Sequence, residues 1–135
     1  MRPSVLFGLA IMAGCSAEDR LTVSEVQYVL RTKLPLRQEL YKAAHGAYAT
    51  DWRDLGLIGG GFAAGPSGFV RVLIHSGTRT GWSASTSDSR GLGPVCVMYH
   101  GEPATFPMGP HHVIPPQPDA AVCAVQAGKA WRGAA

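Results

Sequence analysis

One stretch of helical periodicity, residues 22–45, constrains the fold of this chain more than any other feature. Apolar residues recur there every three to four positions: Leu30, Leu34, Tyr41, Ala44 and, just beyond, Tyr48, widened by Leu36, Leu40, Ala43 and Ala47. The intervening positions are polar: Arg31, Lys33, Arg37, Gln38, Glu39 and Lys42. This spacing is typical of a helix that buries one face and exposes the other to solvent.

The ends of this helix carry recognisable signals. Thr22 and Glu25 have the spacing of a capping box, and Gly46 is suited to end the helix in a left-handed conformation. Pro35 lies inside the run, where it removes one backbone donor and crowds the carbonyl of Arg31. We therefore expect a kink near Pro35 or a break into two helices.

Three short strands are predicted after the helix. Residues 69–75 are mostly β-branched or apolar, which favours a strand that is central in the sheet or buried on both faces. Residues 81–88 alternate, with Trp82, Ala84 and Thr86 on one side and serines on the other. Residues 94–100 form the third strand, and the short turns between the three favour antiparallel pairing.

The remaining segments are rich in glycine and proline. Residues 59–68 and 101–120 are expected to be loops, and the last residues a short helix or a disordered tail. The predicted fold class is α+β: one helix, kinked near Pro35, packed on a three- to four-stranded antiparallel sheet, with a disulfide-closed loop near the C-terminus.

The N-terminus has the features of an export signal. Residues 5–13 are apolar, follow Arg2, and fall short of the roughly 20 residues that a spanning helix needs. The run ends in Met12-Ala13-Gly14-Cys15, which resembles the lipobox of bacterial lipoproteins. The resemblance implies removal of residues 1–14, a lipid on Cys15 and a tether over 15–21. The alternative is an ordinary secretory signal that is cut elsewhere.

Cysteine usage agrees with export. The chain has three cysteines, so a lipid on Cys15 leaves Cys96 and Cys123 as a pair. An oxidising compartment would allow these two to form a disulfide. The absence of a CxxC spacing argues against a zinc or thioredoxin-like site.

Three ordered motifs resemble a known family. They are "YVLRTKLPLRQELYKAAHGAYATDWRDL", "GWSASTSDSRGLGPVCVMYHGEP" and "AAVCAV". Together they are similar to the globular head of a type IV pilin or a type II secretion pseudopilin. The resemblance implies a pilin-like domain over residues 22–124, followed by a tail over 125–135, with Tyr48 packing the helix end onto the sheet.

The chain departs from that family at its start. Pilins begin with a long apolar helix that bears a glutamate and builds the filament core, whereas this apolar run is short, lacks an acidic residue and ends at Cys15. We therefore expect a pilin-like head on a lipid tether that does not enter a filament by the usual helix packing.

Candidate catalytic and metal-binding residues are few. His111 and His112 are adjacent and point apart on any regular element; His100 is the third weak metal candidate, with Glu102 or Asp119 as a possible carboxylate. No HxH, HxxxH, HExxH or GxSxG spacing occurs, so exposed loop histidines are the favoured interpretation. The aromatic residues Tyr48, Trp82 and Tyr99 are expected to serve structural packing, and no cofactor is expected.

The composition bears on partners and location. The formal charge is +3 and no Lys/Arg run occurs, which argues against nucleic-acid binding. The sequence predicts a non-catalytic lipoprotein, a structural or protein-interaction module held to the membrane by its lipid, with an envelope protein as partner. Its expected location is the periplasmic side of the bacterial cell envelope. Ser16 follows Cys15 and favours the outer membrane, because an aspartate at that position is the usual retention signal of lipoproteins. A periplasmic protein that binds a small ligand or a metal is the alternative.

Overall fold

A computed structural model describes residues 21–64, 68–91, 93–102, 105–108, 111–127 and 130–134. The predicted signal peptide, Cys15 and nearly all of the predicted tether lie outside these described residues.

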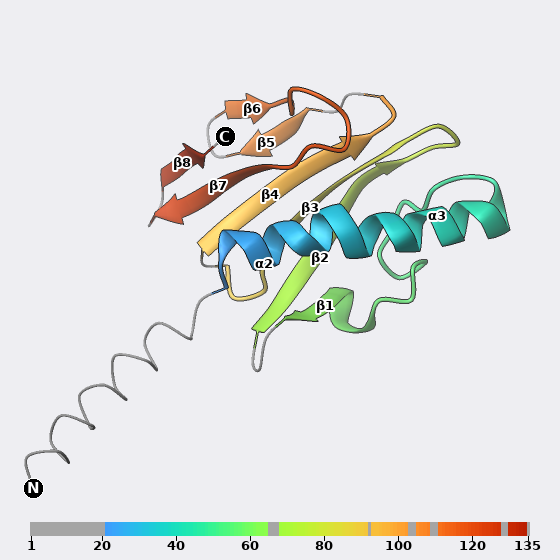
Figure 1. Ribbon diagram of the computed structural model, residues 1–135, viewed down its shortest axis with the longest axis horizontal. Helices are drawn as coiled ribbons and strands as arrows, with labels where there is room; N and C mark the ends of the chain where they lie inside the picture. The colour runs from blue at the N-terminus through green and yellow to red at the C-terminus, as the bar shows by residue number, and fades with distance from the viewer. Residues whose placement is uncertain are drawn as a thin grey trace, which may run out of the picture.

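One helix crosses a six-stranded antiparallel sheet (Figure 1). It consists of α2 (Val23–Tyr28), a π-helical turn η1 (Val29–Lys33) and α3 (Leu34–His45). The predicted capping box is confirmed, because the Glu25 N–H donates to Thr22 Oγ1 (3.2 Å) and the Thr22 N–H donates to Glu25 Oε1 (2.8 Å). Figure 1 shows the helical segments following one another across the sheet.

Pro35 is accommodated without a break in the helix. The Leu34 N–H donates to the Val29 carbonyl, one residue further back than in an α-helix, so the bond pattern has already widened before Pro35. A π-helical turn allows a helix to continue past a proline, which lacks a backbone donor and crowds a carbonyl of the preceding turn. Of the two predicted alternatives, the break into two helices is therefore wrong, and the irregularity near Pro35 takes the form of a π-helical turn.

The helix ends at Gly46, as predicted, with a φ of 85° and an N–H that donates to Lys42 O at 2.7 Å. Two predicted faces need correction. Gln38 is fully buried, although its polarity predicts a position on the solvent-exposed face. Leu36 and Leu40 are 62% and 61% exposed, although their spacing predicts positions on the apolar face.

The sheet has the strand order β1-β2-β3-β4-β7-β8, with every neighbouring pair antiparallel. The strands are β1 (Gly61–Ala64), β2 (Gly68–Gly77), β3 (Trp82–Asp88), β4 (Gly93–His100), β7 (Val122–Ala127) and β8 (Ala130–Ala134). The three predicted strands correspond to β2, β3 and β4. Five strands, β1 to β4 and β7, already exceed the predicted three to four, and β8 extends the sheet further.

The additional strands lie where the sequence predicted loops or a tail. β1 falls in the glycine-rich segment, where Gly61 is required for close approach, because a Cβ there would overlap the Val70 carbonyl oxygen. The final residues, predicted to be helical or disordered, form β8. Alanine and glycine have low β-propensity, so pairing with a neighbouring strand decides their conformation.

The main core lies between the helix and one face of the sheet. The helix contributes Val26, Val29, Leu30 and Leu34, and the sheet contributes Val70, Val72, Ala84, Cys96 and Met98. The buried Thr86 hydroxyl donates to the Val26 carbonyl at 3.0 Å and so ties β3 to the helix. Strand β2 lies between β1 and β3, in agreement with the predicted alternative of a central strand. It is not buried on both faces, because its positions alternate between buried and exposed.

The proline-rich segment covers part of the opposite face. It forms a small hairpin of β5 (Phe106–Met108) and β6 (His111–Val113), which the sequence predicted as a loop. The buried Phe106 ring packs in a second cluster with Val97 of β4 and Ala124 of β7. Strands β4 and β7 thereby have packed residues on both faces.

Candidate functional site

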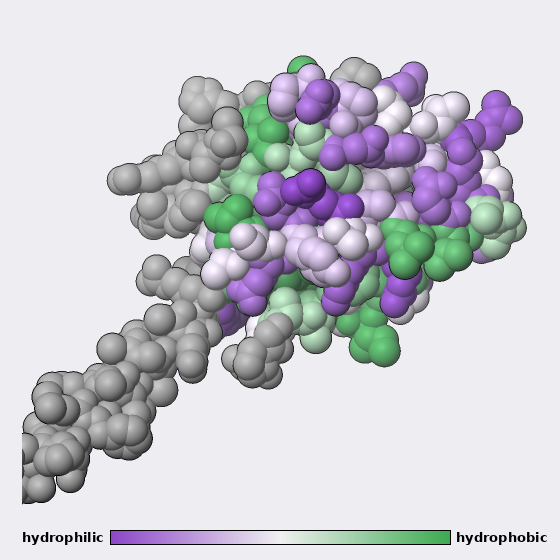
Figure 2. All heavy atoms as spheres, viewed as in Figure 1, coloured by the Kyte–Doolittle hydropathy of each residue, from purple (hydrophilic) through white to green (hydrophobic). Residues whose placement is uncertain are grey.

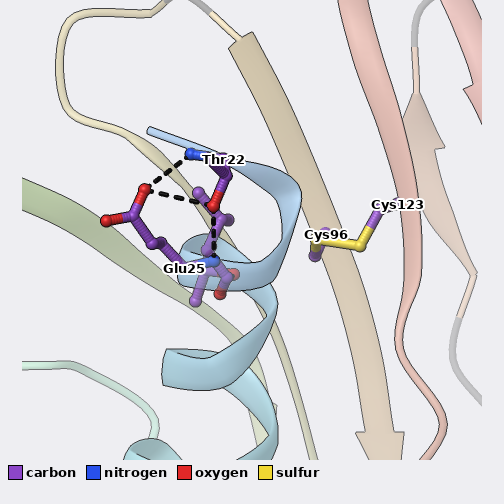
Figure 3. Close-up of a disulfide and its surroundings, with 6 residues drawn as sticks. Thr22, Glu25, Cys96 and Cys123 are labelled. Atoms are coloured by element: carbon purple, nitrogen blue, oxygen red, sulfur yellow. Dashed lines mark hydrogen bonds between the residues drawn. A yellow bond between two sulfur atoms is a disulfide. The ribbon is translucent and has the colours of Figure 1, made fainter. Parts of the chain in front are cut away.

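The disulfide between Cys96 and Cys123 is present, as predicted. The two residues face each other on β4 and β7, with their Cα atoms 4.0 Å apart, and both side chains are buried. Figure 3 shows the bond beside the start of the helix, where Thr22 and Glu25 form the capping box. Its position in the main core indicates a covalent link between two strands.

His100 and Asp119 are brought together, as the sequence allowed. His100 Nδ1 lies 2.8 Å from Asp119 Oδ1 at the end of β4. Asp119 adopts a left-handed φ of 62°, and its N–H donates to the Tyr99 carbonyl at 2.8 Å, which holds the carboxylate in place. Glu102 is exposed near the same strand end.

The other two histidines do not complete a metal site in the described structure. His111 and His112 lie on β6, and only their backbone is described. Among the described residues, no three side chains of the His, Cys, Asp and Glu types lie close enough to hold a metal ion.

Aromatic rings surround His100 and join the helix end to the sheet. The Trp82 ring stacks on His100 at 6.3 Å between centroids, and the Tyr48 ring meets it edge-on at 5.6 Å. The Tyr48 hydroxyl donates to Glu39 Oε2 at 2.7 Å, and Lys42 Nζ lies 4.8 Å from the centroid of the Tyr48 ring.

Several causes keep the Tyr48 phenol protonated. Burial, the hydrogen bond to Glu39 and the negative charges of Glu39 and Asp119 raise the pKa of Tyr48 to about 12. A phenol in this state is a hydrogen-bond donor at neutral pH rather than a base or nucleophile. Tyr48 and Trp82 are buried, as is Tyr99 nearby. The arrangement is that of a packing cluster.

A second polar cluster lies on the opposite face of the sheet, and its residues form no motif that the sequence alone would reveal. His75 Nε2 lies 3.0 Å from Ser85 Oγ, and Ser76 Oγ lies 2.6 Å from Ser83 Oγ across the β2–β3 pair. The His75 ring also meets the Phe106 ring edge-on at 5.1 Å, and partial burial lowers the pKa of His75 from its ordinary 6.5.

The geometry of this cluster argues against catalysis. Ser85 lies in the middle of β3 and is paired with β2 and β4 on either side. The backbone amides of such a strand are used by the ladders, so they are not available to stabilise an oxyanion beside the serine. The His75–Ser85 contact is therefore interpreted as cross-strand pairing.

An open groove runs along strand β1, which forms one edge of the sheet. Among the described strands, β1 has a neighbour only on the β2 side. Two hollows of about 370 and 240 Å³ lie beside it, and we call them together the edge groove. The first is lined by Arg37, Gly56, Leu57, Ile58, Gly61, Phe62, Ala63 and Phe69. The second is lined by Glu25, Tyr28, Val29, Lys33, Ala63 and Ala64.

Apolar side chains are exposed at the rim of the edge groove. Ile58 is 88% exposed and Tyr28 is 54% exposed. Figure 2 shows hydrophobic surface near the start of β1, and a second hydrophobic patch over helix α3, where Leu36 and Leu40 are exposed. Exposed apolar side chains that gather into patches are typical of an interaction surface.

Two cations line the edge groove above the same ring. Lys33 Nζ lies 5.6 Å and the Arg37 guanidinium 5.5 Å from the centroid of Phe62. Arg37 Nη1 also donates to the Leu55 carbonyl at 3.0 Å, and this bond holds the guanidinium group in place. Neither cation pairs with a carboxylate among the described residues. The groove therefore combines apolar walls with a local positive charge.

No described helix is both long enough and apolar enough to cross a membrane. Comparisons of the chain with protein families, with characterised proteins and with solved structures find no match.

Proposed function

We propose that this protein is a non-catalytic lipoprotein of the bacterial cell envelope, whose pilin-like head is a structural or protein-interaction module. It is held to the membrane by a lipid on Cys15 and serves as an accessory of a pilus or a type II secretion system. An envelope protein is its partner.

The order of elements is the observation that carries this proposal. One N-terminal helix crosses one face of an antiparallel meander, and a disulfide joins β4 to the strand that follows the proline-rich segment. This is the arrangement that the resemblance to pilin heads implies. Within that arrangement, Tyr48 packs the end of the helix against the end of the sheet through His100.

The polar side chains support a role without catalysis. The Tyr48 hydroxyl is engaged by Glu39, His100 by Asp119 and His75 by Ser85. Each contact joins two separate elements or two adjacent strands, so each has a structural use. The exposed apolar side chains, by contrast, have no such use within the described part of the chain, and a protein partner would cover them.

Crosslinking in the producing cells tests this proposal. A photoreactive amino acid is placed singly at exposed positions on different sides of the head, namely Tyr28, Leu40, Arg79 and Glu102. A discrete adduct with one envelope protein, at some positions and not at others, is the expected result. Failure of every position to give an adduct, together with a small molecule retained in native mass spectra, would instead support the alternative of a periplasmic ligand-binding lipoprotein.

A further inference from the structure

The edge groove has the geometry of a site for an extended polypeptide. Strand β1 offers an unpaired edge within the described sheet, and the two hollows lie on either side of Ala63, which both share. A strand added to an edge gains its affinity from backbone hydrogen bonds and its specificity from alternate side chains that enter pockets. The hollows are positioned to receive such side chains.

The chemistry of the groove selects the kind of segment. Phe62 and Phe69, with the exposed Ile58, make the larger hollow apolar. Lys33 and Arg37 stand over Phe62 and bring two positive charges to the junction of the hollows. Among the described residues, Glu25 is the one carboxylate that lines the groove, and it accepts from the Thr22 N–H and hydroxyl in the capping box.

We propose that the edge groove binds an extended, acidic segment of a partner protein, which adds a strand to β1. Apolar side chains of the segment fill the hollow at Ile58 and Phe62, and a carboxylate of the segment lies between Lys33 and Arg37. This inference names the binding mode of the interaction module and rests on the proposed function in that respect.

The charges also decide between a partner protein and a second copy of this chain. Pairing of β1 with β1 of another copy would bring two sets of Lys33 and Arg37 together at one interface. Like charges placed opposite each other cost free energy and disfavour that pairing. An acidic segment meets no such opposition.

A matched set of synthetic peptides tests the inference on the full chain carrying Cys15→Ser, which stays without lipid. The peptides of the first set alternate valine and threonine and carry one glutamate each. The position of this glutamate differs from one peptide to the next. The second set replaces glutamate by lysine, and the third keeps glutamate but carries N-methyl groups on alternate backbone nitrogens. Binding is followed by shifts of backbone amide NMR signals.

The glutamate peptides are expected to shift the amides of Phe62, Ala63 and Ala64 at millimolar concentration or below, and the N-methylated peptides are not. Lys33→Glu should weaken binding of the glutamate peptides about tenfold and favour the lysine peptides, whereas Arg79→Glu, a charge reversal in the exposed β2–β3 turn, should change neither.

Three results would overturn the inference. They are the absence of any shift on β1 with all glutamate peptides, equal binding of the N-methylated peptides, and a dimer of this chain that involves β1, detected by sedimentation. None of these results would affect the crosslinks or the lipid on Cys15, so failure of the groove is distinguishable from failure of the proposed function.

Discussion

Gln38 is the residue that fixes the helix to the following loop. Its side chain is fully buried, and its amide makes two bonds with one backbone unit: the Ala49 N–H donates to Oε1 at 2.8 Å, and Nε2 donates to the Ala49 carbonyl at 3.2 Å. A side-chain amide presents a donor and an acceptor in the spacing that an extended backbone residue requires. Gln38 therefore supplies the backbone of Ala49 with the two hydrogen bonds that a neighbouring strand would otherwise supply.

Replacing this amide is predicted to be costly. Gln38→Leu keeps much of the volume but leaves the buried N–H and carbonyl of Ala49 without partners, which should lower the free energy of unfolding by about 2–4 kcal/mol. Urea denaturation measures the change. The control Gln27→Leu, at a half-buried position of the same helix, should change it by less than about 1 kcal/mol. Equal effects of the two substitutions would contradict this account of Gln38.

Asp88 fixes the turn between β3 and β4. Its buried carboxylate accepts from the Arg90 backbone N–H (2.9 Å), from Nε (3.1 Å) and from Nη2 (2.8 Å). The hydrogen bonds of Arg90 lower the pKa of Asp88 from its ordinary 3.8, against the opposing effect of burial. The charged form of Asp88 is thus favoured in the folded protein.

This pKa predicts a pH dependence. Because the folded pKa lies below the unfolded one, the contribution of Asp88 to stability is complete above about pH 4 and is lost as the pH falls through the folded value. Asp88→Asn should therefore lower stability at pH 7 and flatten its dependence on pH below about 4. Urea denaturation series at several pH values give both quantities; an unchanged acid slope in Asp88→Asn would contradict the assignment.

At the scale of elements, the start of the helix and the disulfide form one region. The Thr22 capping box, the first helical turn and the Cys96–Cys123 bond lie side by side in Figure 3. The disulfide closes a loop with a sequence separation of 27 residues, which contains the β5–β6 hairpin. The bond thereby holds β7 beside β4 and limits the freedom of the proline-rich segment in the unfolded chain.

Removing the disulfide is predicted to destabilise the head without changing its fold. Constraint of a loop of this length is worth about 3–4 kcal/mol in the chain-entropy account. A Cys96→Ala, Cys123→Ala chain should show that loss in urea denaturation, and a reductant should have no further effect on it. A loss below about 1 kcal/mol would mean that strand pairing alone orders the segment.

The elements differ in how far local sequence determines them. Thr22, Glu25 and Gly46 specify the helix ends through contacts within a turn, and the β-branched runs specify β2 and β4. Strand β1 and the β5–β6 hairpin were not predictable in this way. Glycine, alanine and proline have little intrinsic preference for strands, so pairing and packing with distant residues such as Phe106 decide their conformation.

For the molecule as a whole, the candidate sites were predictable to different degrees. The Cys96–Cys123 bond followed from cysteine usage, and the proximity of His100 to Asp119 was one of the options that the sequence allowed. The edge groove was not predictable, because it exists only where the helix lies beside a strand about thirty residues further along the chain. Lys33 and Arg37 bring their charges to one place because both lie over the Phe62 ring in the folded chain.

The central claim for the whole molecule is a head that interacts with envelope proteins while a lipid on Cys15 holds it to the membrane. The intact mass of the protein from the membrane fraction of the producing cells tests that claim most directly. The account predicts a mature chain that begins at Cys15 and carries the mass of a diacylglycerol, and it predicts that Cys15→Ser abolishes both. A mature chain without acyl mass, or one that begins at another residue, would contradict it.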